Sequence, residues 1–179
     1  VEERFGMVAN VKNNFKNMSP NSNIDYITHD HNLSIKTRFI DSKSGQQIMR
    51  HDVSKKISQL DLKDLDCKKY DAVIISDYNK GFVTPGVVDF LKTFESPIFV
   101  DTKKRNLECY SGCYVKINEV EDKKSYNKKN CELIVTLGSR GAKWDGKEYK
   151  ADSVEVHDVC GAGDVFLASF CLLYTSPSP

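Results

Sequence analysis

Apolar and polar residues alternate along this chain in two distinct patterns. Continuous apolar runs that end in polar residues are typical of strands buried on both faces of a parallel sheet. Such runs occupy residues 70–77, 98–101, 113–118 and 132–137. Helices are predicted between them, as at residues 87–94, where Thr84-Pro85 forms a start signal. Strands alternating with helices predict an α/β/α doubly wound domain.

Two segments show the two-residue period of strands joined by a tight turn. Residues 33–57 place Ile35, Thr37 and Phe39 on one side, and a glycine-containing turn follows at 42–45. This pattern predicts a β-hairpin. Asp145-Gly146 lies at the centre of residues 143–149 and predicts a second, smaller hairpin.

Helical spacing returns near both ends of the chain. Val8, Val11, Phe15 and Met18 recur at helical intervals before Ser19-Pro20, so a helix is predicted there. A last apolar run with helical spacing begins near residue 162. The turn just before it therefore lies at a helix N-terminus.

Composition limits the classes of function. Apolar residues make up 40% and charged residues 28% of the 179 residues, as in ordinary globular proteins. The net charge of +1 gives no reason to expect nucleic acid or an anionic membrane as a partner. No apolar run is long enough to cross a bilayer, and the six cysteines form no C-x-x-C pair. We therefore expect a cytoplasmic protein with reduced thiols.

The turn at residues 158–164 reads Asp-Val-Cys-Gly-Ala-Gly-Asp. Glycines at a helix N-terminus let backbone N–H groups approach an anion closely, and the helix dipole favours negative charge there. Asp164 in the first turn is consistent with simple stabilisation of the helix dipole. Beside a phosphate-sized cradle, a carboxylate can instead accept the proton of an attacking hydroxyl.

This seven-residue string resembles the D-[TV]-x-G-A-G-D signature of the ribokinase-like (PfkB) carbohydrate kinases. The resemblance implies a ribokinase-like three-layer α/β/α fold with a small β-hairpin lid, and ATP-dependent phosphoryl transfer to a sugar hydroxyl. It makes Asp164 the catalytic base. It also makes the amides of Gly161, Ala162 and Gly163 an anion hole for the transferring phosphate.

Further motifs arrive in the order that the family has them. Asn118 and Glu121 are similar to the N-x-x-E that helps to place Mg²⁺ and the phosphates, usually through water, and oxygen ligands suit a hard cation. Thr136, Gly138 and Gly141 resemble the T-x-G-x-x-G beside the nucleotide phosphates. ATP and Mg²⁺ are the implied cofactors.

The sugar side of the site is implied by several shorter similarities. Residues 6–15 resemble the G-G-x-x-N-V-A segment that faces the sugar, residues 76–81 an S-D-Y-x-K-G motif, and residues 101–103 a D-P-K motif. Arg38 or Arg50 on the lid could grip a sugar phosphate, and solvent-facing strand arginines explain them equally well. The substrate-side candidates are Gly6, Asn10, Arg38, Arg50, Asp77, Lys80 and Lys103.

The lid sequence is most similar to the D-glycero-D-manno-heptose 7-phosphate kinase branch, which implies the 1-kinase reaction on the way to ADP-heptose. A small sugar phosphate is then the partner, and the lid at about 33–57 implies a homodimer. Two alternatives remain open. One is another sugar or nucleoside kinase of the family, and the other is a non-catalytic sugar sensor on the same fold.

The resemblance also sets boundaries. The family has a strand before the G-G-x-x-N segment and further elements after G-A-G-D, so residues 1–170 are interpreted as a partial kinase domain that is inactive by itself. Residues 171–179 resemble a translated sequencing adapter. We therefore expect a non-native tail there.

Overall fold

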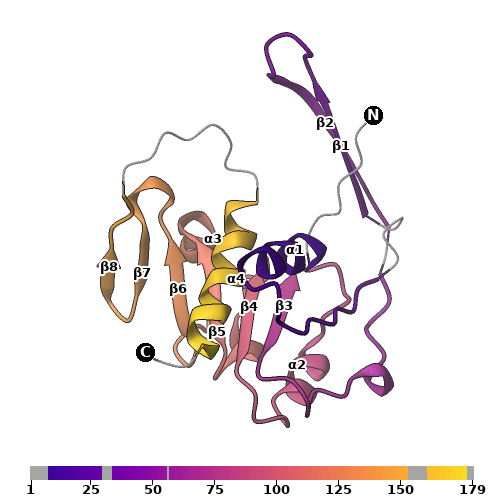
Figure 1. Cartoon of the computed structure of the whole chain (residues 1–179), viewed down its shortest axis with the longest axis vertical. Coiled ribbons are helices and arrows are strands. Elements are labelled where there is room, and N and C mark those ends of the chain that lie inside the picture. The colour runs from indigo at the N-terminus through magenta and orange to yellow at the C-terminus, as the bar shows by residue number, and fades with distance from the viewer. Residues whose placement is uncertain (1–7, 30–33, 56, 153–160, 177–179) are drawn as a thin grey trace.

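The computed structural model describes residues 8–29, 34–55, 57–152 and 161–176 (Figure 1). Gly6 and residues 158–160 of the glycine-rich turn lie outside these ranges. The first described element is helix α1 (Val8–Met18), whose last turn is closed by a hydrogen bond from the Ser19 amide to the Phe15 carbonyl at 2.8 Å. The predicted first helix is therefore present and ends where Ser19-Pro20 predicts.

Six strands within the described ranges form one sheet in the order β3-β4-β5-β6-β7-β8. The first four are parallel and the last two antiparallel. They are β3 (Val73–Asp77), β4 (Ile98–Thr102), β5 (Tyr114–Asn118), β6 (Glu132–Thr136), β7 (Ala142–Trp144) and β8 (Lys147–Tyr149). All the predicted strands of the main sheet are present.

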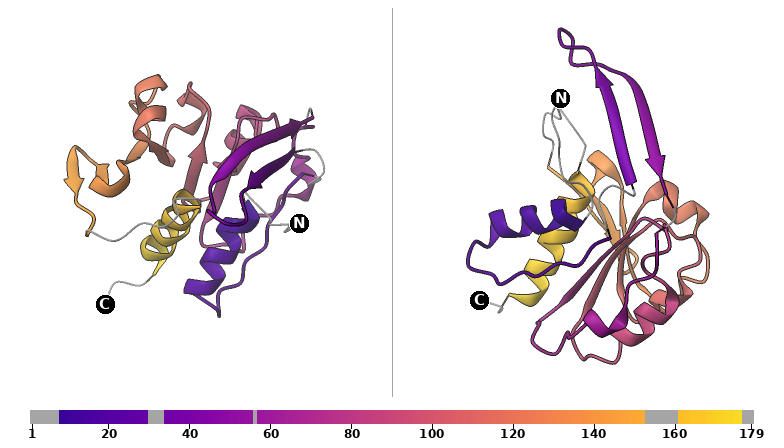
Figure 2. Two further views of the ribbon diagram at one scale, coloured as in Figure 1. Left: turned by 90° about the horizontal axis from the view of Figure 1, so that it is seen from above. Right: turned by 90° about the vertical axis from the view of Figure 1, so that its right-hand side faces the viewer.

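Helices cover both faces of this sheet (Figure 2). Helix α4 (Ala162–Thr175) packs beside α1 on one face. The other face carries α2 (Pro85–Leu91), and α3 (Glu119–Lys124) follows β5 directly. Single-turn helices η2 (Leu62–Asp64), η3 (Glu108–Tyr110) and η4 (Gly138–Arg140) lie in the connections. The three-layer α/β/α arrangement agrees with the predicted fold class.

The alternation of β4 explains why the sheet has two cores. Phe99 is fully buried against Val11 of α1 and Leu167 of α4. Its neighbour Val100 points to the opposite face and is fully buried with Val88 of α2. Because successive side chains of a strand face opposite sides, one apolar run supplies both cores.

β3 is less buried than its apolar run predicts. Only Ile75 and Asp77 of its five residues are buried, and the others are partly exposed. β3 is the first strand of the described sheet, and no described strand pairs with its outer edge. Val73, Ile74 and Ser76 also line a cavity, which leaves these side chains partly accessible.

The predicted long hairpin forms a separate antiparallel sheet that stands away from the body (Figure 1). It consists of β1 (Ser34–Ile40) and β2 (Gln47–Ser54). Ile35 pairs with Val53 and Phe39 with Met49, whereas Lys36 pairs with Asp52 on the opposite face. The hairpin therefore has one apolar and one charged face.

Local turn chemistry fixes two more elements. Asp145 and Gly146 both have positive φ, at 47° and 72°, as a two-residue hairpin turn between β7 and β8 requires. Thr84 caps α2 by accepting a hydrogen bond from the Val87 amide at 3.4 Å, and Pro85 occupies the first turn.

Helix α4 continues to Thr175, so the adapter-like residues 171–175 are helical, and their origin stays a prediction. No helix within the described ranges is both long and apolar enough to span a bilayer.

Candidate active site

The glycine-rich turn starts helix α4 in a conformation that needs small residues. Gly161 is the residue before the helix and has a left-handed backbone, with φ of 85°. Its carbonyl accepts hydrogen bonds from the amides of Asp164 and Val165 at 2.9 and 3.0 Å. A Cβ on Gly161 would lie 3.1 Å from Nδ2 of Asn10, so the turn packs closely against α1. The N–H groups of Ala162 and Gly163, which precede these amides in the first helical turn, have no acceptor within a regular helix and are the ones that suit an anion.

Asp164 and Asn10 meet across 154 residues of sequence. Nδ2 of Asn10 donates a hydrogen bond to Oδ2 of Asp164 at 2.6 Å. Burial raises the pKa of the Asp164 carboxyl, and the nearby charge of Asp101 raises it further. The hydrogen bond from Asn10 and the charges of Lys116 and Lys103 act in the opposite direction. A carboxylate with a raised pKa is a stronger proton acceptor than an exposed one.

A cavity of about 270 Å³ lies at the carboxyl ends of β4, β5 and β6, next to the start of α4. This is the edge of a parallel sheet at which α/β proteins bind ligands. It brings together residues that are distant in sequence. Its lining consists of Tyr78, Asp101, Lys103, Lys116, Asn118, Thr136, Gly161, Gly163 and Asp164.

A buried ion pair lies at the base of this pocket. Lys116 of β5 donates from Nζ to Oδ2 of Asp101 at 2.7 Å, and the two side chains are only 6% and 8% exposed. A Cβ on Gly163 would lie 2.6 Å from this Nζ. The glycine therefore allows an ammonium group to lie directly against the helix N-terminus. Two sources of positive potential converge there, and they suit a phosphate.

One carboxylate oxygen of Asp101 is available to a further ligand. Its Oδ1 is buried and accepts no hydrogen bond from the described residues, and Nζ of Lys103 is 3.9 Å away. A buried carboxylate oxygen without a donor is costly unless a cation or a protic ligand reaches it. The pocket therefore has a free acceptor beside its ammonium groups.

Asn118 and Glu121 form the N-terminal cap of α3. Oδ1 of Asn118 accepts from the Glu121 amide, and Oε2 of Glu121 accepts from the Asn118 amide, both at 2.9 Å. Oε1 of Glu121 pairs with Lys103. The predicted metal-side and substrate-side residues are therefore in contact with each other.

The side-chain oxygens of these residues suit a Mg²⁺ ion that is also bound to phosphates. Within the described ranges, no group of three or more His, Cys, Asp or Glu side chains could hold a metal ion by itself. One or two carboxylates with an amide oxygen suffice when phosphates and water supply the other ligands. Glu121, Asn118 and the free oxygen of Asp101 form such a set.

The predicted nucleotide-side residues surround the end of β6. Thr136 lines the pocket, and its hydroxyl is 3.4 Å from the Ile117 carbonyl. Gly138 and Gly141 lie in the following turn with φ of 64° and 103°, outside the pocket lining. A Cβ on Gly141 would approach the Tyr149 carbonyl to 1.9 Å, so this glycine is required by the packing of β8.

Asp77 lies outside the small pocket and is occupied by protein groups. It is 3% exposed, and Lys104 pairs with its Oδ2. The Tyr110 hydroxyl donates to the same oxygen at 2.5 Å, and the Asn79 amide donates to Oδ1 at 2.8 Å. This network holds the loop that carries Tyr78. The substrate role of Asp77 remains a prediction.

The other substrate-side candidates are also away from the small pocket. Arg38 and Arg50 are cross-strand partners on the exposed hairpin, and Arg50 pairs with Asp52 at 2.8 Å. Lys80 lies on the wall of a larger cavity. Of the predicted substrate residues, the structure brings Asn10 and Lys103 to Asp164.

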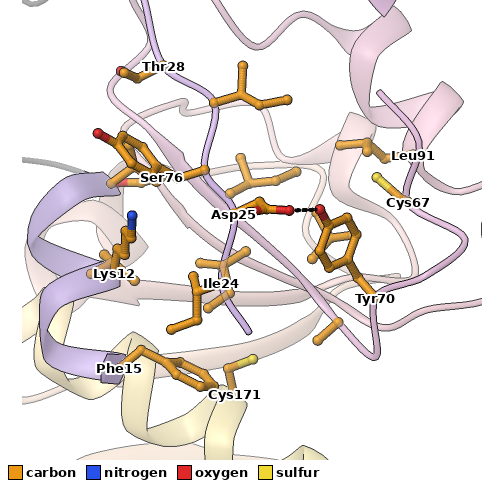
Figure 3. Close-up of a pocket in the computed structure, with 18 of the residues that line it drawn as sticks. Lys12, Phe15, Ile24, Asp25, Thr28, Cys67, Tyr70, Ser76, Leu91 and Cys171 are labelled. Atoms are coloured by element: carbon orange, nitrogen blue, oxygen red, sulfur yellow. Dashed lines mark hydrogen bonds between the residues drawn. The ribbon is translucent and has the colours of Figure 1, made fainter. Parts of the chain in front are cut away.

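The larger cavity has a volume of about 590 Å³ and lies between α1, the segment after it, β3 and α2 (Figure 3). Apolar side chains dominate its wall, among them Phe15, Ile24 and Leu91. Its prominent polar contact is the hydrogen bond from the Tyr70 hydroxyl to Asp25. The ion pair of this cavity, Lys69 with Asp25, is 63% and 59% exposed, whereas the pair of Lys116 with Asp101 beside Asp164 is buried. The small pocket is therefore the candidate active site.

Three members of the small pocket are not among the predicted site residues, although the motifs at 76–81 and 101–103 contain two of them. Asp101 and Lys116 lie inside or at the end of strand runs, and Tyr78 lies in the loop after β3. A lysine between Val115 and Ile117 in a run of buried residues was a usable signal, since lysine is rarely buried unless it is paired.

The sequence was also compared with known proteins, and no family model matches it. The bifunctional protein HldE of Sulfurimonas denitrificans is 33% identical over 162 residues, which cover 70% of this chain and 34% of that protein. HldE of Wolinella succinogenes is 35% identical over 126 residues, 55% of this chain and 27% of that protein. HldE of Campylobacter jejuni serotype O:2 is 30% identical over 164 residues, which cover 72% of this chain and 35% of that protein. The chain therefore spans about a third of the length of these relatives.

Among solved structures, phosphofructokinase-2 from Escherichia coli in complex with fructose-6-phosphate has a similar fold. The TM-score is 0.56, the sequence identity is 13%, and the match covers 78% of this chain and 57% of that one. The fold, the order of the motifs and the HldE relatives agree with one another: the chain resembles the ribokinase-like (PfkB) carbohydrate kinases, and it is similar in sequence to part of the HldE proteins.

Proposed function

We propose that the full-length protein that contains this chain catalyses the transfer of the γ-phosphoryl group of ATP to a sugar hydroxyl. The proposed acceptor is D-glycero-D-manno-heptose 7-phosphate and the attacking group its 1-hydroxyl, which gives the 1,7-bisphosphate on the way to ADP-heptose. One observation carries the proposal. A half-buried carboxylate, Asp164, shares a pocket with the buried ammonium of Lys116 and the glycine-rich start of α4.

Asp164 is the proposed proton acceptor. As the sugar oxygen forms its bond to the γ-phosphorus, its proton passes to a carboxylate oxygen of Asp164, and the bond between that phosphorus and the β–γ bridging oxygen breaks to release ADP. Asn10 holds Oδ2 through its amide, which fixes the orientation of the carboxylate. Burial raises the pKa of Asp164 and so increases its affinity for the proton.

Charge on the transferring group is balanced by groups already in place. The N–H groups at the start of α4 and the ammonium of Lys116 lie close together, and in the proposed reaction they would stabilise charge on the equatorial phosphoryl oxygens. Asn118, Glu121 and Asp101 would hold Mg²⁺, which when bound neutralises charge on the phosphates. For Glu121 to do so, Lys103 has to leave its Oε1.

We also infer that the hairpin acts as a lid and as a dimer contact. Its apolar face exposes Phe39 by 47%, Met49 by 52% and Ile35 by 46%. A two-stranded sheet is marginally stable alone, and an exposed apolar face is stabilised by a partner surface. A second copy of the hairpin offers the same apolar face.

The test of the catalytic proposal is Asp164→Asn in the full-length protein that contains this chain. We expect kcat for heptose 7-phosphate to fall by about 10²- to 10⁴-fold, the range for loss of a general base. The dissociation constant for ATP should remain within about twofold, because the asparagine keeps the size and one acceptor oxygen of the residue. Turnover close to wild type would refute the assignment.

The raised pKa of Asp164 also predicts the thermal stability of this variant, which serves as a control for its folding. Because burial raises the folded-state pKa of Asp164 above its ordinary value of 3.8, ionising the carboxyl lowers stability as pH rises through the folded pKa. That loss is absent below the unfolded pKa. At neutral pH the Asn variant should therefore unfold at the same temperature as wild type or higher, measured by calorimetry. A lower unfolding temperature would attribute the lost activity to misfolding.

A further inference from the structure

Lys36 links the hairpin to the wall of the active site. It lies on the charged face of the hairpin, opposite Asp52 in the strand register. Its Nζ is 4.9 Å from the centre of the Tyr78 ring. Tyr78 in turn lines the pocket that contains Asp164. A cation over an aromatic face is attracted to it, so this contact fixes the ammonium beside the pocket.

The surroundings of Lys36 have an excess of positive charge. Arg50, Arg38 and Lys80 all lie close enough to repel its ammonium. Asp52 attracts it, but that carboxylate also pairs with Arg50 at 2.8 Å. Among the described residues, none forms a salt bridge with Lys36 within 4 Å. Burial lowers the pKa of Lys36, as expected for an ammonium whose charge is incompletely balanced.

A second ammonium approaches the same aromatic ring from the sheet. Nζ of Lys103 is 5.9 Å from the centre of the Tyr78 ring, and Lys103 itself lines the pocket. Its charge is partly balanced by Glu121. An anion bound at Tyr78 would therefore be attracted by Lys36 first and by Lys103 second. A dianion would be favoured over a monoanion there, because four basic side chains lie around Lys36 and Tyr78.

We propose that Lys36 binds the phosphate monoester that the acceptor sugar already carries, with Tyr78 holding the lysine in place. This inference rests on the proposed function and deepens it, since it assigns the selection of a phosphorylated acceptor to a residue of the hairpin. The site is separate from the anion hole for the transferring group, which lies at Gly161–Gly163. The proposed phosphate contact is therefore Lys36, which lies beside the pocket, in place of the pair Arg38 and Arg50.

The test is calorimetric titration of the full-length protein, without ATP, with heptose 7-phosphate and with the unphosphorylated heptose. The variants are Lys36→Met and Lys36→Arg. Lys43→Met is the matched control, because Lys43 lies in the turn of the same hairpin and removes the same charge. We expect Lys36→Met to weaken binding of heptose 7-phosphate at least tenfold and binding of the unphosphorylated heptose less than twofold. Lys36→Arg should recover part of the loss, and Lys43→Met should bind as wild type.

Equal losses for both sugars, a loss with Lys43→Met as large as with Lys36→Met, or no wild-type binding of heptose 7-phosphate would each overturn the inference. Because ATP is absent, the titration is independent of catalysis. A protein that binds heptose 7-phosphate through Lys36 but releases no ADP would contradict the proposed function and support the phosphate site. If the wild-type protein turns over heptose 7-phosphate and Lys36→Met binds this sugar as tightly as wild type, the proposed function is supported and the phosphate site at Lys36 is contradicted.

Discussion

At the scale of single residues, the active site depends on pairs that are far apart in sequence. The seven-residue motif predicts Asp164 as the base and a second motif predicts Asn10 as a substrate residue, and the structure adds that Asn10 donates a hydrogen bond to Asp164. Lys116 could not be predicted from a motif, because its meaning lies in the ion pair with Asp101 across two strands. Asp77 shows the opposite limit, since its motif does not reveal that Lys104 and Tyr110 already occupy its carboxylate.

Gly163 offers a direct test of the contact with Lys116. In Gly163→Ala the new Cβ would lie 2.6 Å from Nζ of Lys116, so the ammonium has to move away from the helix N-terminus. Because that atom is the end of a flexible side chain, we expect the fold to survive and kcat to fall by about tenfold or more. Kinetics and thermal unfolding measured on the same samples separate the two effects.

Gly86→Ala is the matched control. Gly86 lies in α2, and a Cβ there has its nearest contact, the Thr84 hydroxyl, at 3.9 Å. It should keep full activity and gain up to about 1 kcal/mol of stability from the better helix former. Equal activity of the two alanine variants would contradict the account of Lys116.

At the scale of elements, turn residues predicted the hairpins better than apolar runs predicted the burial of strands. Asp145-Gly146 specifies its hairpin because two adjacent positive φ angles suit few residues. The burial of β3 could not be predicted, since it depends on which strands lie beside it and not on its own apolar run. Gly141 was predicted from a motif to lie beside the nucleotide, and the structure adds a packing reason for it.

That packing reason predicts a large stability effect. In Gly141→Ala the Cβ would meet backbone atoms of residues 149–151, the nearest at 1.9 Å, and φ of 103° is unfavourable for alanine. We expect the free energy of unfolding in urea to fall by about 3 kcal/mol or more, through loss of the β6–β7–β8 pairing.

Gly138→Ala provides the comparison, because Gly138 also has a positive φ but its Cβ would meet no atom within 4 Å. It should lose only about 1 kcal/mol, the usual cost of a left-handed alanine. Similar losses in the two variants would show that backbone strain, and not the contact with β8, decides the need for glycine at 141.

At the scale of the whole molecule, the proposals assign a separate role to each face of the hairpin. The charged face turns Lys36 toward Tyr78 and the pocket, and the apolar face is exposed. The alternation of residues 33–57 predicted the hairpin itself. Which face serves the pocket could not be predicted, because it depends on how the hairpin is attached to the body.

The proposed dimer is tested by polar substitution of the apolar face. We expect Phe39→Ser with Met49→Ser to convert the full-length protein from dimer to monomer in light scattering after size-exclusion chromatography, because the pair lies face to face across the strands. Ile48→Ser is the control. Ile48 is 72% exposed but lies at the shift in strand register, outside the cross-strand pairs of the apolar face, so the dimer should persist. A monomeric wild type, or a dimeric double variant, would remove the hairpin from the proposed assembly.

The most direct measurement of the central claim is a crystal structure of the full-length protein with ADP, Mg²⁺, heptose 7-phosphate and aluminium fluoride in place of the transferring phosphoryl group. The account predicts that the acceptor hydroxyl lies within about 3 Å of a carboxylate oxygen of Asp164. The fluoride complex should contact the N–H groups of the turn at Gly161–Gly163 and the ammonium of Lys116. An acceptor hydroxyl held by a different base, with the fluoride complex away from the start of α4, would contradict it.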